Sequence, residues 1–464
     1  NPDAEEVCDG TVDDNCDGRV DEGCYPLWSG SYTTADSDSK IHGNGTMDIF
    51  GSAVAAADWN DDGLVDIAVG ASQDELSSTY ADDGVVYVYQ GSIASGDALC
   101  TDNDAALLYS TSSSHDDFGE KLWALPDMNR DGYPELVTTF RNNTYSWDLI
   151  HYRGTALSGT AAYNTNSYYG SLHCTDFSYA GNFYTGTSSY VACGYLSQFT
   201  ATGETYVYGD ASGTVRATFV GEAVGDNAGA SIDFAHDLDG DGVNDALIGS
   251  PMNGYAASNA GVTYLVLGPY TTGSYTLRGA DTKFYGVTYN DSLGGEVTAG
   301  DIDGDGADDP ILGADNYDYS GRSASGAVYI FTSFGTGMVP ASDADVVIYG
   351  ATGSNQIGSS ALSTGDVDGD GNVDIFIPTP SDNTGGNSAG AAWLVYGPLS
   401  GSYDLSTDSD AVWRGEGQAY YTGNDGGIIG DTNGDGVDDI LLAGYGADAG
   451  GYNMAGAVWI FLGG

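Results

Sequence analysis

Short apolar runs separated by polar turns recur along the chain after residue 50. A branched apolar run follows each of several Asp-rich turns, as in DIAVGA at 66–71 and DILLAG at 439–444. About 20 residues past each turn comes another run, headed by Gly and rich in Val, Tyr and Trp, as in GVVYVYQG at 84–91 and GAVWIFLG at 456–463. Runs of this composition, bounded by Gly, Asn, Asp and Ser, are typical of β-strands, and no segment shows convincing helical periodicity. The pattern predicts an all-β chain.

The Asp-rich turns return at a regular spacing. A decayed copy (DFSYAGNFY) lies near Asp176, with Ala180 in the place of the central Asp, and the intact copies, D-x-[DN]-x-D-G-x-x-[DE], begin at Asp58, Asp127, Asp237, Asp301, Asp366 and Asp431. From Asp58 to Asp431 there are 373 residues in six steps, so the mean period is about 62 residues. Such self-similarity indicates a repeat architecture. Seven units with four short strands each predict a seven-bladed β-propeller of four-stranded blades over residues 38–464.

The last of these units lacks a fourth strand, because the sequence stops at Gly464 directly after its third run. The segment SKIHG at 39–43 has the character of a fourth strand and follows no other strand. We expect it to pair as the outer strand of the last blade. This pairing would close the ring and leave only short strand edges exposed.

The turns have the oxygen-rich composition that calcium binding requires. Positions 1, 3 and 5 place three side-chain oxygens on one side of a tight turn, position 7 offers its carbonyl, and position 9 adds a carboxylate. Gly at position 6 permits a positive φ. Ca²⁺ takes about six to eight oxygen ligands in flexible geometry, whereas Mg²⁺ demands a near-ideal octahedron, so we expect Ca²⁺. An ion-free turn is the alternative, because Asp and Gly favour turns for local reasons. Repetition in register favours the metal.

The expected ligands, with position 7 acting through its carbonyl, are Asp58, Asn60, Asp62, Leu64 and Asp66; Asp127, Asn129, Asp131, Tyr133 and Glu135; Asp237, Asp239, Asp241, Val243 and Asp245; Asp301, Asp303, Asp305, Ala307 and Asp309; Asp366, Asp368, Asp370, Asn372 and Asp374; and Asp431, Asn433, Asp435, Val437 and Asp439. This set predicts about six calcium ions in the propeller.

Residues 1–25 form a separate module rich in Cys and Asp. Its core fits the same turn pattern, so we expect one more calcium ion there, with the ligands Asp13, Asn15, Asp17, Arg19 (through its carbonyl) and Asp21. A segment this small cannot bury a core and needs a metal or disulfides to hold a shape. Residues 26–37, rich in Ser and Thr, have the composition of a connector.

The six cysteines favour an oxidising compartment. Local spacing favours a Cys174–Cys193 disulfide between two adjacent expected strands of the third unit, where the bond could replace the ion. Cys8–Cys16 with Cys24–Cys100 is one arrangement of the other four. A zinc site is a weaker interpretation, because there is no C-x-x-C and, of the five His, only His173 neighbours a cysteine.

The net charge of −56 excludes some classes of partner. Eleven Lys and Arg residues form no basic patch, so nucleic-acid binding is disfavoured, and no apolar run approaches the length of a membrane span. Seven Ca²⁺ would add +14 to −56 and leave −42, so calcium accounts for only part of the acidity. Solubility through self-repulsion, a salty habitat and cation-mediated packing between subunits all stay open.

Taken together, these features resemble the FG-GAP repeats of integrin α-subunits and related bacterial surface proteins. The Phe-Gly element appears at Phe50-Gly51 and Phe118-Gly119, and as Ile357-Gly358; the second element appears as GAS (70–72), GSP (249–251) and GAD (313–315). Residues 1–24 resemble the short MopE-like metal-binding motif of bacterial surface proteins. The resemblance implies a secreted, bacterial, cell-surface adhesion protein.

We therefore expect a binding protein rather than an enzyme: an extracellular, calcium-stabilised adhesion or surface-structural protein whose ligand is a cell-surface protein or glycan. No H-E-x-x-H or phosphate-binding Gly-Lys loop is present, and no catalytic residue stands out from the calcium ligands. One alternative is a self-assembling subunit of an extracellular filament or sheath, joined through the N-terminal module as a homo-oligomer. A second alternative is a polysaccharide-active, lyase-like enzyme.

Overall fold

The structure is a computed structural model. It describes residues 28–74, 84–91, 93, 96–102, 106–109, 115–127, 132–142, 147–152, 159–162, 174–180, 190–195, 202–209 and 214–463. The predicted module at 1–25 therefore lies outside the described residues.

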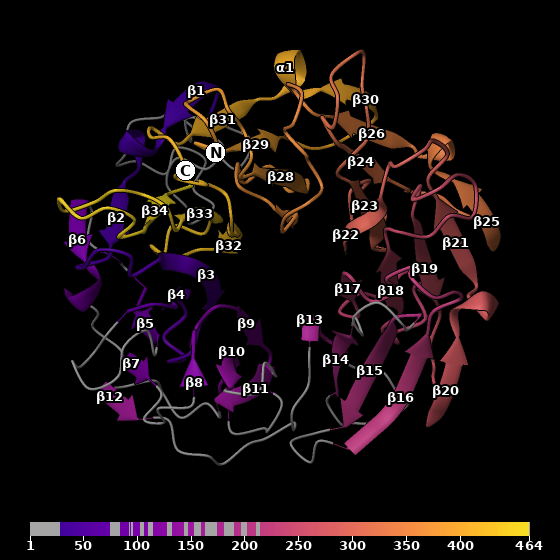
Figure 1. The fold of residues 1–464 in the computed structure, drawn as a ribbon, viewed down its shortest axis with the longest axis horizontal. Coiled ribbons are helices and arrows are strands. Elements are labelled where there is room, and N and C mark those ends of the chain that lie inside the picture. The colour runs from indigo at the N-terminus through magenta and orange to yellow at the C-terminus, as the bar shows by residue number, and fades with distance from the viewer. Residues whose placement is uncertain are drawn as a thin grey trace, which may run out of the picture.

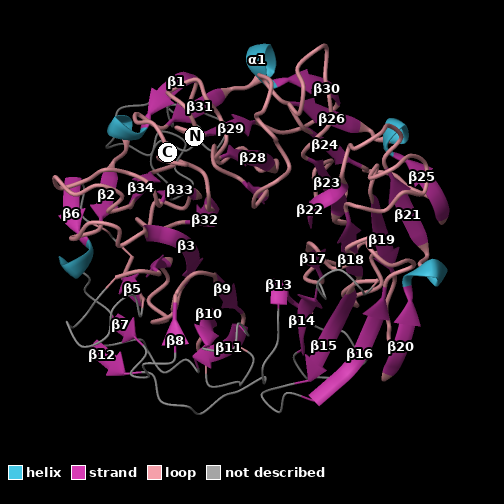
Figure 2. Ribbon diagram, in the orientation of Figure 1, coloured by secondary structure: helices cyan, strands magenta, loops and turns pink. Residues whose placement is uncertain are grey.

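Short β-strands dominate the described part of the chain. They form seven sheets, which stand around a central opening (Figure 1). Helical elements among the described residues are single turns, such as α1 (Leu405–Asp408) (Figure 2). The prediction of an all-β propeller is confirmed. The count of seven complete four-stranded blades stays a prediction, because part of the second unit lies outside the described residues.

Three sheets come from the first half of the chain. The first contains β3 (Phe50–Ala57), β4 (Asp66–Ala71), β5 (Val85–Tyr89), β7 (Ala106–Tyr109) and β12 (Gly159–Ala162). The second contains β8 (His115–Asp116), β9 (Leu122–Leu125), β10 (Glu135–Asn142) and β11 (Trp147–Tyr152). The third contains β13 (Cys174–Tyr179), β14 (Tyr190–Tyr195), β15 (Glu204–Gly209), β16 (Thr214–Val220) and β20 (Gly273–Thr276).

The remaining four sheets follow in order around the ring. The fourth contains β17 (Ile232–Asp233), β18 (Ala246–Ser250), β19 (Val262–Val266), β21 (Thr282–Tyr285) and β25 (Gly337–Pro340). The fifth contains β22 (Leu293–Gly300), β23 (Asp309–Ala314), β24 (Ala327–Ile330), β26 (Val346–Tyr349) and β30 (Gly401–Asp404). The sixth contains β27 (Ser363–Gly365), β28 (Asp374–Thr379), β29 (Ala391–Val395), β31 (Ala411–Arg414) and β1 (Gly30–Thr33). The seventh contains β32 (Gly426–Gly430), β33 (Asp439–Gly444), β34 (Ala457–Phe461), β2 (Ser39–His42) and β6 (Gly96–Leu99).

Neighbouring units share strands. In six sheets, four antiparallel strands are extended at the outer edge by a fifth, parallel strand that belongs to the next unit around the ring. In five of these units a single helical turn leads from that strand into the unit's own fourth strand, as α1 does between β30 and β31. Among the described residues, six of the seven units are therefore hydrogen-bonded into the sheet of the preceding unit as well as into their own.

The N-terminal residues supply the piece that the seventh unit lacks. β1, a helical turn at Thr34–Asp36 and β2 repeat the arrangement of an outer strand, a turn and a fourth strand. β2 pairs antiparallel with β34, with Ile41 opposite Val458. The prediction that 39–43 completes the last blade is confirmed. β1 lies inside the segment that its composition marked as a connector, because a short polar edge strand carries no apolar alternation.

The hydrophobic core lies between the sheets rather than within one centre. Buried apolar side chains of the described residues form seven clusters, and each cluster fills the space between two neighbouring sheets. An open row of seven sheets would have only six such interfaces. The seventh cluster joins Ile41, Val458 and Ile460 to Phe50 and Ile67 of the first sheet, so the ring is closed by packing as well as by strand pairing.

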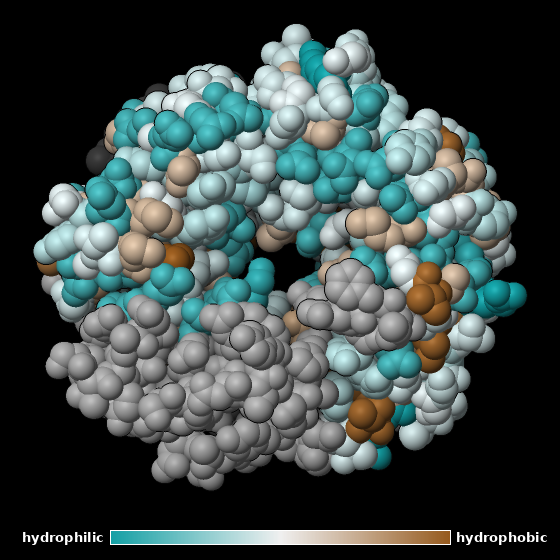
Figure 3. Space-filling model, viewed as in Figure 1, coloured by the Kyte–Doolittle hydropathy of each residue, from teal (hydrophilic) through white to brown (hydrophobic). Residues whose placement is uncertain are grey.

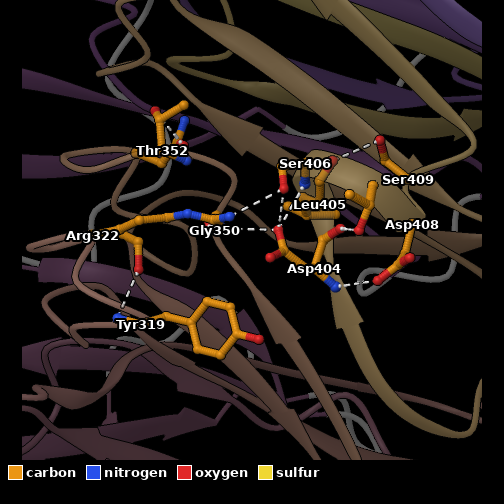
Figure 4. Close-up of polar contacts among 12 residues, drawn as sticks. Tyr319, Arg322, Gly350, Thr352, Asp404, Leu405, Ser406, Asp408 and Ser409 are labelled. Atoms are coloured by element: carbon orange, nitrogen blue, oxygen red, sulfur yellow. Dashed lines mark hydrogen bonds and ion pairs between the residues drawn. The ribbon is translucent and has the colours of Figure 1, made fainter.

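Polar contacts between units accompany this packing. Nη1 of Arg322, in the fifth unit, donates to the carbonyl of Gly350 at 2.9 Å and to Oδ1 of Asp404 at 2.8 Å (Figure 4). Its Nη2 donates to Oγ of Ser406 at 3.2 Å, and its guanidinium lies 5.6 Å from the ring centre of Tyr319. Asp404 and Ser406 belong to the sixth unit, at the end of β30 and in the turn after it. Arg322 therefore bonds the outer strand of the sixth unit to the fifth sheet.

Removal of residues 1–37 should destabilise the ring without opening it. Trp28 and Tyr32 contact the buried ring of Trp413, with ring centres 5.3 Å and 5.8 Å apart, and β1 pairs with β31. Loss of these contacts should lower the free energy of unfolding by about 2–4 kcal/mol in urea titrations at saturating calcium. Removal of residues 1–27 is the matched control and should change little. Equal stability of the two truncated chains would contradict the role given to β1.

Candidate metal sites

The six intact Asp-rich turns occupy equivalent positions in the fold. Each joins the innermost strand of a sheet to the second strand: the turn at Asp58 leads from β3 to β4, and the turn at Asp366 leads from β27 to β28. The repeat in the sequence therefore becomes a ring of turns at one end of the strands.

Each turn is closed in the same way around its Gly. The Gly at position 6 has a φ between +85° and +101° in all six turns, and a Cβ added there would meet no atom within 4 Å. The backbone conformation, rather than crowding, therefore requires glycine. The same Gly N–H donates to a carboxylate oxygen of the Asp at position 1, over 2.7–2.9 Å in every turn.

The acid at position 9 has a structural role that its place in the turn pattern did not reveal. Asp245 is 2 % exposed; its Oδ2 accepts the N–H of Leu238 at 2.8 Å, and its Oδ1 accepts the N–H of Gly268 at 2.8 Å. Gly268 lies just past the third strand of the unit. The carboxylate thus ties the start of the turn to the end of β19. The position 9 acids of the turns at Asp58, Asp366 and Asp431 accept equivalent pairs of N–H groups.

Burial and like charge act together on these acids. Burial raises the pKa of Asp245 to about 7, and the carboxylates of Asp239 and Asp237 contribute to the rise. Burial likewise raises the pKa of Asp309 and of Asp374 to about 7, again with acids of the same turn contributing. A buried carboxylate beside others of the same charge is the arrangement that a bound cation relieves.

Three turns bring acids close enough to share one ion. In each, one carboxylate oxygen from each of positions 1, 3 and 9 lies within 4.8 Å of the other two; the residues are Asp237, Asp239 and Asp245; Asp301, Asp303 and Asp309; and Asp366, Asp368 and Asp374. Oδ1 of Asp301 is buried and has no hydrogen-bond partner. An all-oxygen donor set with an unsatisfied buried oxygen fits a hard divalent cation such as Ca²⁺.

The other predicted ligands are distributed as follows. The position 5 acids Asp62, Asp241, Asp305, Asp370 and Asp435 each accept the N–H of position 7, which holds that backbone group beside the acids. Asn60 and Asn433 occupy position 3 of the turns at Asp58 and Asp431. Asn129 and Asp131 lie outside the described residues, as do Asp13, Asn15, Asp17, Arg19 and Asp21.

The expected register of the third unit is wrong. Asp176 does not begin a turn; it lies within β13, and its Oδ2 accepts the N–H of Ile232 in the next unit at 2.8 Å. The segment DFSYAGNFY resembles the turn motif in spacing, but its first four residues belong to a strand that continues to Tyr179. Cys174 and Cys193 are joined in a disulfide between β13 and β14, which confirms that pairing.

The pairing of Cys24 with Cys100 is not found. Cys100 is a buried free cysteine, and burial raises the pKa of its thiol to about 12. It lies in the cluster between the seventh and first sheets, where the thiol packs as a small apolar side chain.

A further set of polar residues surrounds the central opening, and the motif analysis missed it. A cavity of about 510 Å³ is lined by residues of all seven units, among them Lys121, Asp176, Glu296 and Asp425. Hydrophilic atoms border the opening on the face shown in Figure 3. Burial raises the pKa of Asp176, Glu296 and Asp425.

These central acids connect neighbouring units. Asp425 accepts the N–H of Val54 at 3.0 Å across the junction between the seventh and first units, and Asp176 accepts the N–H of Ile232 across the junction between the third and fourth units. The sequence holds a signal for the charged residues at the opening: Lys121 and Glu296 stand two residues after the Gly of Phe118-Gly119 and Leu293-Gly294, and Asp425 has the same spacing from Thr422-Gly423. The arrangement indicates ring-stabilising acceptors rather than a second metal centre.

Comparison with known proteins agrees with this geometry. Residues 358–395 match the FG-GAP repeat family, and this segment runs from the Gly of Ile357-Gly358 through the turn at Asp366 to the end of β29. The chain carries an FG-GAP repeat. The FG-GAP, integrin-like resemblance is thereby confirmed, whereas the MopE-like resemblance of residues 1–24 stays a prediction.

Two individual proteins show the extent of the similarity. Integrin alpha-4 of Xenopus laevis is 27% identical over 204 residues, which are 43% of this chain and 19% of that protein, so the match spans about a fifth of the relative's length. The WD40 domain of Toxoplasma gondii coronin superposes with a TM-score of 0.44 at 11% identity, over 92% of this chain and 84% of that one. The second similarity is too low to bear on the fold, which rests on the sheets described above.

Substitution of the position 9 acid and of the position 3 acid of one turn should affect stability in different ways. Asp245→Asn should lower the free energy of unfolding by about 2–3 kcal/mol even in excess chelator, because an amide NH₂ then faces a buried backbone N–H. Asp239→Asn, at an exposed position of the same turn, should be nearly neutral in chelator and should reduce the stabilisation by added calcium. Urea titrations with and without calcium measure both effects. An Asp245→Asn chain as stable as the parent in chelator would refute the structural role.

Proposed function

We propose that this FG-GAP propeller is an extracellular, calcium-stabilised binding protein with an adhesive or surface-structural role. The observation that carries the proposal is the recurrence of the three-acid cluster at the same point of successive units, with a buried Asp301 oxygen left unsatisfied in one of them. The FG-GAP match and the similarity to a protein named integrin alpha-4 support the adhesive role.

In this proposal calcium acts on the turns rather than in a reaction. A bound divalent cation supplies positive charge that offsets the crowded carboxylates. The chain's own residues do the rest: positions 1, 3 and 9 would hold the ion, and Gly at position 6 keeps the turn closed. Because the position 9 acid is also bonded to the end of the third strand, an ordered turn holds three strands of its unit together.

The ligand, a protein or a glycan, would bind at the end of the propeller opposite the metal turns. Of eleven exposed large hydrophobic residues in the described part of the chain, eight lie in connections at that end: Met47, Val224, Met252, Tyr255, Val287, Tyr289, Tyr452 and Met454. Tyr255 and Tyr289 are 63% and 73% exposed. Exposed apolar side chains that gather on one face are typical of interaction surfaces.

Two other functions can be separated from binding by experiment. A self-assembling filament or sheath subunit would appear as regular polymers when native material is imaged in calcium. A polysaccharide lyase would release unsaturated sugar products from acidic polysaccharides. No helix among the described residues has the length and apolar character needed to cross a lipid bilayer.

Removal of calcium should lower the melting temperature of the chain. Each ion bound only by the folded state adds about 2.7 kcal/mol when its free concentration is a hundred times the dissociation constant. Thermal unfolding followed by circular dichroism in calcium and in excess chelator measures the difference. An unchanged melting curve after metal loss has been verified would remove calcium from the proposal.

Binding should require the aromatic residues of the opposite end. The probes are arrays of extracellular-matrix proteins and of glycans, overlaid with the purified chain in calcium. We expect a bound array member whose affinity falls about tenfold or more, about 1.4 kcal/mol, for Tyr255→Ala with Tyr289→Ala. Val215→Ala, at an exposed site near the metal-turn end of β16, is the control. Loss of binding in the control alone, or no binding by the calcium-loaded chain, would count against the proposal.

A further inference from the structure

The N-terminal segment 29–43 closes the ring through strands in two different sheets. β1 runs parallel to β31 in the sixth sheet, and β2 lies between β34 and β6 in the seventh. The backbone N–H of Leu462 also donates to Asp38 at 3.0 Å, and Ile41 is 1% exposed between the seventh and first sheets. All these partners are distant in the sequence. The contacts would therefore be the same if the segment belonged to another copy of the chain.

A short hinge connects this segment to the first sheet. Residues 43–49 lead from β2 to β3, and two of them, Met47 and Ile49, have φ values of +68° and +55°. The equivalent turns of other units have the same conformation at Asn290 and Ser292, Ser354 and Gln356, and Ala419 and Tyr421. The conformation therefore belongs to the repeat, and Ile49 is the strained residue because it is the β-branched one among them. Short hinges under strain favour exchange of the element that they hold, because exchange lets the hinge extend.

We propose that residues 29–43 exchange between copies of this chain, so that the segment of one copy completes the seventh blade of another. The partner is a second copy, because the acceptor edge already fits this segment residue by residue, from Ser39 opposite Ile460 to His42 opposite Ala457. Exchange preserves every strand pair and lets the hinge extend, which relieves the positive φ at Ile49. It gives up the backbone hydrogen bonds from Met47 to Asn453 and from Ile49 to Met454. The inference does not depend on the proposed ligand or on calcium.

The order of synthesis favours the exchange. Ile41 and Val458 are paired although they lie 417 residues apart in the chain, so the closing segment is made long before its acceptor. Contacts at such separation form slowly, since a long loop must be closed. Until then the edge of β34 is unpaired, and unpaired edges accept strands from other chains.

The donor and the acceptor are different surfaces. Each copy offers one segment and one open edge, so exchange produces either reciprocal pairs or head-to-tail chains. Closure within one chain competes, with an effective concentration on the order of millimolar for a short tether. Exchange should therefore dominate where copies are crowded.

An isotope-mixing experiment tests the proposal on the full chain. His42→Cys with Ala457→Cys places two thiols directly opposite each other in the β2–β34 pair. Light and heavy-isotope versions are mixed in urea, refolded at several concentrations and oxidised, and the peptide linked through positions 42 and 457 is analysed by mass spectrometry. We expect light–heavy linked peptides in a fraction that rises with concentration towards the statistical mixture.

Hinge variants sharpen the result. Deletion of residues 44–46 should raise the mixed fraction, and a Gly-Ser insertion after Gly45 should lower it. Only light–light and heavy–heavy links at every concentration, in the shortened variant as well, would overturn the proposal. Should the cysteine pair prevent folding, a fluorescent peptide of residues 29–43 is added while the unmodified chain refolds. Incorporation of the peptide would support exchange, and its absence would refute it.

Discussion

The pairing of β2 with β34 is the constraint on which the rest of the ring depends. Each sheet buries its apolar faces only against its two neighbours, so the first and seventh sheets are complete only if they meet. The segment 39–42 brings the first and seventh sheets into contact, because Ile41 packs in the cluster between them. The sharing of outer strands extends the same principle, since six junctions in the described part of the chain then combine side-chain packing with backbone hydrogen bonds. Stability in such a ring is distributed over its junctions, and each junction is needed to close the others.

The metal turns and the strands are coupled through one side chain. The acid at position 9 is buried, and burial raises its pKa. As Asp245 shows, it also accepts one backbone N–H at the start of the turn and one at the end of the third strand. It is therefore a fixed point of the fold before any cation is considered. The acids at positions 1 and 3 lie around it at the surface, where a cation can reach them. A turn of this kind can respond to calcium without being the only element that holds the blade.

The sequence was a good guide wherever a feature repeats locally. Apolar runs identified the central strands, and the D-x-[DN]-x-D-G pattern identified the turns whose glycines have positive φ. Features that depend on partners distant in the sequence could not be predicted. The strand β1 is polar and lies on an edge, so its pairing with β31 leaves no mark in composition. The same Asp245 satisfies the motif whether or not it bonds Gly268. Asp176 fitted a turn by spacing alone, because only the fold shows that its strand continues past it.

The adjacency of β2 and β34 also decides how the ring meets mechanical force. The two strands are antiparallel, and Ser39, at the start of β2, lies opposite Ile460, near the end of β34. Once β1 has been released from β31, tension between the N-terminal and C-terminal segments would therefore enter at the same edge of the pair. Its hydrogen bonds would be loaded one after another, as in a zip, rather than together in shear. A ring tethered at one end and pulled through its opposite face avoids this geometry, so attachment through a single terminus is the mechanically durable arrangement.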